Sequence, residues 1–298
     1  MHAVRVAMLA AAGLMVSWSC ANRGDAQNSS DFDSVRVLET SRDRDTLEKA
    51  AVALASSGDP QSIARLGGFL TRAEFLARLD DLRRPSDKTR HLQRLFMALA
   101  EHPNAATERL CLGLASDSIF LSDDDRRIYL LPALAAVKPM SEATVRVFRQ
   151  ANAEGYYNLN VTLLARNGSP KALALFEEMI RDRDVPVSRR VDALHTSIPP
   201  NRADPAILDC ADRLLKTPLE SEVATGVIES VFDYQSRRWF GPSRSAPVPP
   251  AWEDAPKTVL QRVLALATQV RGRSLSPELA AAVSETADRV QRILNGYR

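Results

Sequence analysis

Apolar residues recur at helical spacing over most of the chain. In the clearest segments they occupy every third or fourth position, so that they fall on one side of a helix. These segments lie at 172–180, 259–270 and 279–294. The pattern predicts amphipathic helices, each of which must bury one apolar face.

A polar residue followed by proline opens five of the helical segments. Proline is tolerated in the first turn of a helix, where its missing N–H would have no partner, and a preceding Ser or Asp can cap the exposed amides. Each pair therefore predicts a helix start. The pairs are Asp59-Pro60, His102-Pro103, Lys138-Pro139, Ser169-Pro170 and Asp204-Pro205.

A second helical segment follows each of these starts, so the repeating unit is a helical hairpin. The second segments are expected at 87–101, 122–137, 154–166, 185–198 and 219–234. One hairpin cannot bury its own apolar stripe, whereas stacked neighbours can. We therefore expect an all-α fold, an α-solenoid of antiparallel hairpins over residues 45–235 with a capping hairpin at 256–298. The alternative is a compact helical bundle without regular stacking.

Residues 168–194 resemble a known repeat family. Gly168-Ser169-Pro170-Lys171-Ala172-Leu173, followed by 185–190 and Ala193-Leu194, resembles a HEAT or HEAT-like repeat of the armadillo-type superhelix. Residues 57–60 and 124–127 repeat parts of the motif, while a tetratricopeptide-like hairpin is the rival at 156–168. In the family, Asp and Arg bond within and between neighbouring repeats. The resemblance therefore implies a structural role for Asp184, Arg190 and Arg127.

The first nineteen residues are typical of a signal peptide. Arg5 precedes an apolar run at 6–16 that is too short for a permanent span of about 20 residues. Cys20 stands where bacterial lipoproteins carry their lipidated cysteine, and the preceding Ser19 resembles the end of a lipobox. We predict lipidation at Cys20 and an outer-membrane lipoprotein that faces the periplasm. The alternative is ordinary cleavage, which releases a soluble periplasmic or secreted protein.

Two further features follow from export. Residues 20–44 are polar and carry little pattern, which predicts a tether between the membrane and the helical domain. Cys111 and Cys210 remain as the thiols of the mature chain, each within an apolar segment and three repeats apart. Because stacked helices lie about 10 Å apart, that spacing exceeds the reach of a disulfide. We predict two free, buried thiols.

Residues 236–255 interrupt the helical pattern with a proline-rich loop. The loop carries Trp239 and Trp252, which are all the tryptophans of the chain beyond the signal segment. One interpretation is a binding surface for a protein partner, formed by Trp239, Phe240 and Trp252 with Arg237 and Arg238. The other is that the aromatic rings fold back and seal a groove or an open end of the array.

The sequence offers no constellation that predicts catalysis. Its 39 Lys and Arg balance 37 Asp and Glu, which argues against a nucleic-acid partner. His91, His102 and His195 lie in different helical units without a metal-ligand spacing, and the acidic run at 123–125 does not fit a calcium loop. Nucleophile-elbow and phosphate-loop motifs do not occur in the sequence. We therefore expect no cofactor, no metal and no enzymatic activity.

The leading hypothesis is a scaffold that binds another protein of the bacterial cell envelope and is held at the membrane by a lipid on Cys20. The alternative is a periplasmic ligand-binding protein or enzyme, with a pocket between the repeats and the 236–255 loop. A chaperone that holds unfolded clients is a third possibility. Fold-level analogy does not choose among them.

Overall fold

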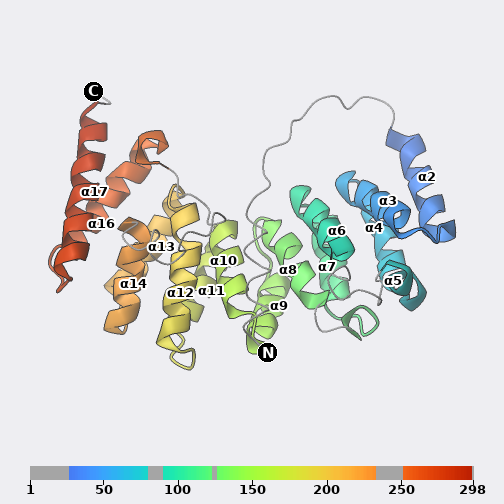
Figure 1. Cartoon of the computed structure of the whole chain (residues 1–298), viewed down its shortest axis with the longest axis horizontal. Coiled ribbons are helices and arrows are strands. Elements are labelled where there is room, and N and C mark those ends of the chain that lie inside the picture. Colours follow the sequence, from blue (N-terminus) through green and yellow to red (C-terminus); the bar gives the residue numbers. More distant parts are fainter. Residues whose placement is uncertain (1–26, 80–89, 123–125, 233–250, 297–298) are drawn as a thin grey trace. The chain divides into compact units, whose positions relative to one another are not determined.

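The structure is a computed structural model that describes residues 27–79, 90–122, 126–232 and 251–296. Every regular element within these ranges is a helix, and none of the described residues lies in a strand (Figure 1). The predicted all-α class is therefore confirmed for the described chain. The chain divides into two compact units, and the division falls after Leu163 inside helix α10.

The N-terminal unit comprises residues 20–163. Its helices are α2 (Gln27–Thr40), α3 (Arg44–Ser56), α4 (Pro60–Leu70), α5 (Ala73–Leu79), α6 (Arg90–Glu101), α7 (Ala105–Leu114), α8 (Arg127–Ala136), α9 (Glu142–Ala153) and the first part of α10 (Tyr157–Asn167), with a short 3-10 turn at Phe120–Ser122. In this unit, α3, α6 and α8 pack one after another, and so do α4, α7 and α9. The helices thus form two rows, which contact each other where α3 meets α4 and where α8 meets α7 and α9.

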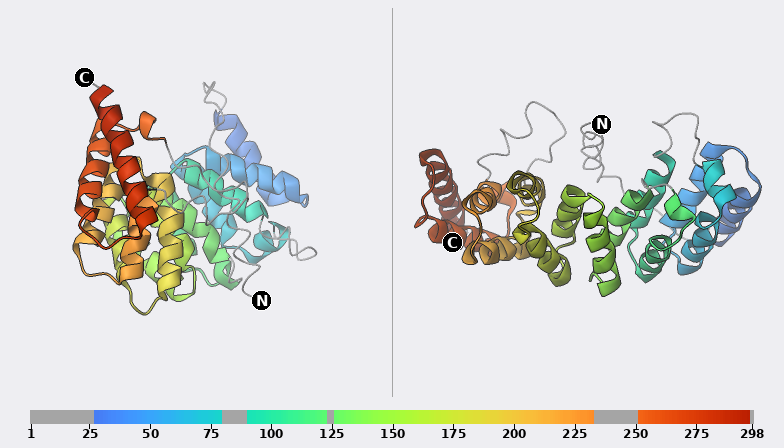
Figure 2. Two further views of the ribbon diagram at one scale, coloured as in Figure 1. Left: turned by 60° about the vertical axis from the view of Figure 1, so that its left-hand side comes forward. Right: turned by 90° about the horizontal axis from the view of Figure 1, so that it is seen from below.

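The C-terminal unit comprises the described residues from Leu164 onward. Its helices are the end of α10, α11 (Pro170–Arg181), α12 (Val187–Ser197), α13 (Pro205–Lys216), α14 (Ser221–Phe232), α16 (Lys257–Val270) and α17 (Pro277–Gly296), with 3-10 turns at Pro199–Asn201 and Trp252–Asp254. Here α11, α13 and α16 form one row, while α12, α14 and α17 form the other. The last two helices, drawn in orange and red, lie side by side in both views of Figure 2.

Three of the five predicted proline starts are confirmed. Pro60, Pro170 and Pro205 each stand at the first position of a helix. The other two predictions were wrong by a few residues, because a better cap follows the proline. Asn104 accepts hydrogen bonds from the N–H groups of Ala106 and Thr107, and Ser141 caps α9 through the N–H of Thr144.

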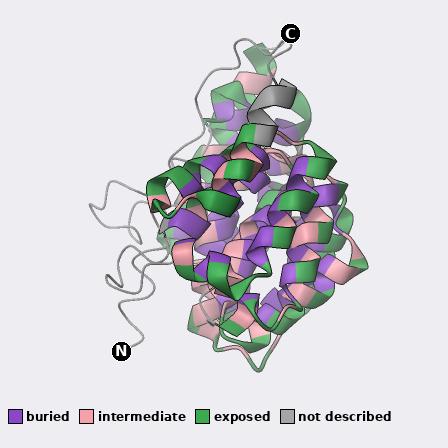
Figure 3. Cartoon of the chain, turned by 90° about the vertical axis from the view of Figure 1, so that its right-hand side faces the viewer, coloured by how far each residue is buried: buried purple, intermediate pink, exposed green. Residues whose placement is uncertain are grey.

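The five expected second segments each contain a helix, namely α6, α8, α10, α12 and α14. Helices α10, α12 and α14 each begin two or three residues later than the sequence pattern suggested. Buried and exposed positions alternate along single helices, as Figure 3 shows in purple and green. That alternation is what an amphipathic helix requires when one face packs on its neighbours.

The predicted tether at 20–44 was wrong over its second half, because Gln27–Thr40 is the helix α2. One apolar side chain, Leu38, is fully buried where α2 packs on α3. The guanidinium of Arg78 donates to the carbonyl of Leu38 at 2.9 Å and to that of Ser41 at 2.8 Å. Carbonyl groups at a helix end lack partners within the helix, so Arg78 on α5 completes the end of α2.

Candidate functional site

A groove lies between α12 and α14 in the C-terminal unit. Its volume is about 350 Å³, and two helix faces line it: Val187, Ser188 and Val191 from α12, and Ser221, Glu222, Thr225 and Glu229 from α14. The α14 residues are spaced at one and two helical turns, so that they share a face. The two rows of packed helices leave this face of α12 and α14 accessible.

The groove is acidic and carries no basic lining residue. Two valines form its apolar part, three hydroxyl groups surround them, and Glu222 and Glu229 supply the charge. Glu229 also contacts the ring of His195, with 3.1 Å between its Oε2 and Nε2 of the imidazole. His195 is buried beneath α14, while Glu222 is exposed. The arrangement suits a ligand that brings a cation next to an aliphatic group.

Arg190 fixes the end of α14 against α12. Its guanidinium is 1% exposed and donates to both carboxylate oxygens of Glu220 at 3.0 Å. It also donates to the carbonyl groups of Ile180 and Val185. The hydrogen bonds from Arg190 lower the pKa of Glu220 to about 2. Because Glu220 directly precedes α14, this bonding holds the entrance of the groove in place.

Gly226 lets α12 and α14 approach closely beside the groove. A Cβ atom at this position would lie 3.2 Å from Cγ2 of Val191 and 3.5 Å from Cδ1 of Leu194. A side chain at this position would therefore crowd Val191, which would have to shift by a few tenths of an ångström. The groove depends on a small residue at this point of α14.

The other residues with an implied structural role differ in what they bond. Arg127 pairs with Glu154 at 2.9 Å, between Nε and Oε2, and its side chain is nearly buried. Asp184 is exposed. Its backbone N–H donates a hydrogen bond to Oδ1 of Asp182. The resemblance implied bonding by the side chains of all three residues. Of the three, Arg190 makes the most extensive side-chain hydrogen bonds.

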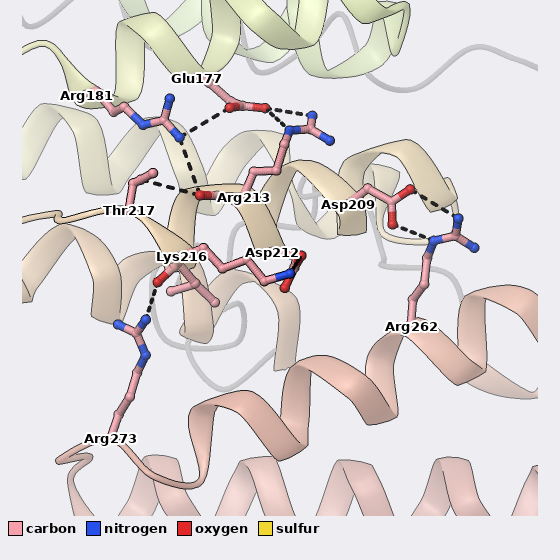
Figure 4. A network of polar contacts seen from close by, with 10 residues as sticks. Glu177, Arg181, Asp209, Asp212, Arg213, Lys216, Thr217, Arg262 and Arg273 are labelled. Carbon is pink, nitrogen blue, oxygen red and sulfur yellow. Dashed lines mark hydrogen bonds and ion pairs between the residues drawn. The ribbon is translucent and has the colours of Figure 1, made fainter.

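Ion pairs also cross the row formed by α11, α13 and α16 (Figure 4). Glu177 on α11 is buried and forms two ion pairs. Its Oε1 lies 2.7 Å from Nη2 of Arg213 on α13, and its Oε2 lies 3.3 Å from Nη2 of Arg181 on its own helix. Farther along α13, Asp209 binds Arg262 of α16 at 2.6 Å. Two of the pairs join successive helices of the row, α11 to α13 and α13 to α16, so they belong to the packing of the row.

The two predicted free thiols are confirmed. Cys111 and Cys210 are both buried and unpaired by a disulfide. Burial raises the pKa of each thiol well above the usual value for cysteine. The neighbouring carboxylate, Glu108 beside Cys111 and Glu177 beside Cys210, raises the pKa further. Neither thiol is thus primed for nucleophilic or redox chemistry.

A second cluster of titratable groups lies in the N-terminal unit, where sequence reasoning expected no metal ligands. Ligand atoms of Asp45, Glu48 and His91 lie within 4.8 Å of one another. Burial by itself raises the pKa of Glu48. The hydrogen bonds with Arg94 and His91 have a larger combined effect, so the pKa lies below its ordinary value. No sequence pattern indicated the cluster, because His91 lies 43 residues from Glu48 and only the packing of the helices brings them together.

The predicted partner surface lies largely outside the described residues. Cys20, Arg237, Arg238, Trp239 and Phe240 all fall in that part of the chain. Trp252, by contrast, is 4% exposed, and the guanidinium of Arg202 lies 4.3 Å from its ring centroid. Of the two interpretations of the loop, the burial of Trp252 fits the one in which the aromatic rings fold back against the helices.

Comparison with known proteins leaves the fold and the site to be argued from the chain itself. No protein-family model and no curated protein matches the sequence. A crystal structure of an engineered protein aligns with 89% of this chain and 98% of its own, at 16% identity and a TM-score of 0.28. None of the described helices is long and apolar enough to cross a membrane.

Proposed function

We propose that the protein is an exported helical-repeat scaffold that binds another protein of the bacterial cell envelope. In this proposal the hairpins form an α-solenoid of the HEAT-like, armadillo type. The neighbour relation within each unit supports it, since each row helix packs on the next helix of its own row. Cys20 would carry the lipid anchor, as the sequence predicts.

The groove between α12 and α14 is the observation that carries the binding function. Glu222 is exposed there beside two valines, the carboxylate of Glu229 lines the groove while bonded to His195, and no Lys or Arg is in the lining. A protein segment with a Lys or Arg side chain next to an aliphatic one matches that chemistry. Arg190 and Gly226 hold the helices at the spacing the groove needs, so that the surface exists before a partner arrives.

A crosslinking experiment tests the groove directly. A photoreactive residue at Thr225 of the full chain should capture one partner at a defined segment that contains Lys or Arg. The same residue at Glu285, an exposed position on α17, is the control and should not capture that partner. Crosslinks that are the same from both positions, or that scatter over many proteins, would contradict the proposal.

Affinity for the purified partner then tests the charge. Glu222→Lys should weaken binding by at least tenfold, and added salt should weaken binding to the unaltered chain. Glu285→Lys makes the same charge change away from the groove and should leave the affinity within about twofold. Equal affinities for the two variants would overturn the groove as the contact surface.

The lipid anchor has its own test. The unaltered protein should fractionate with the outer membrane, and Cys20→Ser should move it to the soluble periplasmic fraction. A protein that is soluble without the substitution would show instead that ordinary cleavage releases it. In that case the scaffold would still bind its partner, but in solution.

A further inference from the structure

Three side chains with metal-binding atoms converge in the N-terminal unit, away from the proposed groove. Asp45 and Glu48 lie three residues apart on α3, and His91 lies in the first turn of α6. Residues three apart on a helix share a face. Because α6 packs against α3, His91 comes to the same place.

The burial of the three groups differs in a way that suits a bound ion. Glu48 is 7% exposed and His91 8% exposed, while Asp45 is exposed. Two ligands are therefore held by packing, and the third faces water. Zinc sites with three protein ligands keep a fourth position for water, which the open side at Asp45 provides.

The spacing of the ligand atoms fits one shared ion. Nitrogen and oxygen ligands bind Zn²⁺ at about 2.0–2.2 Å, so two ligands of one ion lie about 3–3.5 Å apart. The three ligand atoms here lie within 4.8 Å of one another, which is close to that spacing. Imidazole together with carboxylate is a donor set that Zn²⁺ accepts.

Arg94 orients the buried carboxylate without occupying both of its oxygens. It binds Oε1 of Glu48 at 2.7 Å, and Oε2 faces Nδ1 of His91. Oxygen Oε2 is thus the atom left for a second cation. Hydrogen bonds of this kind to a metal-binding carboxylate fix its direction. The Arg94 side chain is 48% exposed, so water solvates part of its guanidinium.

We propose that Asp45, Glu48 and His91 form a binding site for one Zn²⁺ ion that joins α3 to α6. The ion takes the place of the hydrogen bond between His91 Nδ1 and Glu48 Oε2. His91 binds in its neutral form, with its remaining proton on Nε2. A water molecule completes the coordination on the side of Asp45.

The chain contains a matched control for this site. His195 and Glu229 also join two neighbouring helices, α12 and α14, through a buried imidazole and a carboxylate. Among the described residues, a third ligand atom accompanies only the His91 and Glu48 pair. If any buried His–Glu pair bound Zn²⁺, both places would bind the ion. The proposal predicts binding only at the cluster that contains His91.

Equilibrium dialysis of the full chain, without an added histidine tag, tests the site. After treatment with a chelator, the protein should bind one Zn²⁺ per chain, and Co²⁺ should give the visible absorption of a four-coordinate ion. Asp45→Asn and His91→Gln should each weaken Zn²⁺ binding by at least tenfold, while His195→Gln should leave it unchanged. Asp45 is exposed, so its variant keeps the fold even where a change at His91 does not.

Two results would overturn the proposal. One is no stoichiometric Zn²⁺ binding by the unaltered chain at micromolar concentration. The other is retention of the bound ion by Asp45→Asn, with loss in His195→Gln. In either case the three groups serve as an ion-pair network between α3 and α6. The groove proposal is unaffected by both results, because it rests on different residues of the other unit.

Discussion

Arg190 and Glu220 share two hydrogen bonds of 3.0 Å, although they lie 30 residues apart and differ sharply in exposure. The guanidinium is 1% exposed and the carboxylate side chain 34%. The buried partner also donates to two backbone carbonyls. Its removal therefore leaves several polar groups without partners inside the C-terminal unit.

We expect Arg190→Met to lower the free energy of unfolding by about 1–3 kcal/mol, since it removes the donor to the carbonyls of Ile180 and Val185. Arg183→Met is the matched control. Arg183 approaches the same Glu220 at 3.9 Å, but its side chain is 78% exposed, so the expected loss is below about 0.5 kcal/mol. Urea unfolding measures both. Similar losses for the two variants would contradict the structural role of Arg190.

The lowered pKa of Glu220 predicts how stability depends on pH. The folded value is about 2 and the ordinary value is 4.5, so the contribution of Glu220 is complete above the ordinary value. It is lost as the pH falls from about 4.5 toward 2. Glu220→Gln should remove this part of the acid dependence, and unfolding curves between pH 6 and pH 2 measure it. An unchanged acid slope in that variant would show that Glu220 is not the group involved.

Two glycines should respond to alanine in opposite directions. Gly168 has φ of 68°, and a Cβ atom there would lie 2.9 Å from Oδ2 of Asp204. Gly168→Ala should therefore cost about 1–2 kcal/mol of stability. Gly68 lies inside α4, and a Cβ atom there would meet nothing within 4 Å. Gly68→Ala should add about 0.5–1 kcal/mol, so the two midpoints in urea should move apart.

The thiols should react only after unfolding. Cys111 and Cys210 are buried and their pKa values are raised, so the reactive thiolate is scarce and inaccessible. In a Cys20→Ser variant, a thiol reagent such as Ellman's reagent should titrate both groups in denaturant and neither within minutes under native conditions. A rapid reaction of either thiol in the folded protein would contradict the described packing.

The all-α class and several helix starts followed from the sequence because they depend on local chemistry. Proline with a preceding cap fixes a helix start within a few residues, as Pro60, Pro170 and Pro205 show. The start of α9 was misplaced because Ser141, rather than the proline before it, caps the helix. The burial of both cysteines followed from their place in apolar segments, and their free state from their wide spacing along the predicted repeats.

The features that sequence reasoning missed depend on partners far along the chain. Helix α2 has little apolar pattern of its own, and its order comes from Leu38 against α3 and from Arg78. His91 gave no metal signal, because its carboxylate neighbours stand on another helix. The bonding of Arg190 was implied through family resemblance, but its partner Glu220 was not identified. Tertiary packing decides each of these cases.

The contact between Arg78 and the end of α2 also sets an order in time. A chain that is made from its N-terminus presents α2 well before Arg78 has emerged, since 37 to 40 residues separate the donor from its acceptors. Until then the last carbonyls of α2 have only water as a partner. Helix α2 therefore gains these backbone partners only after α5 has appeared.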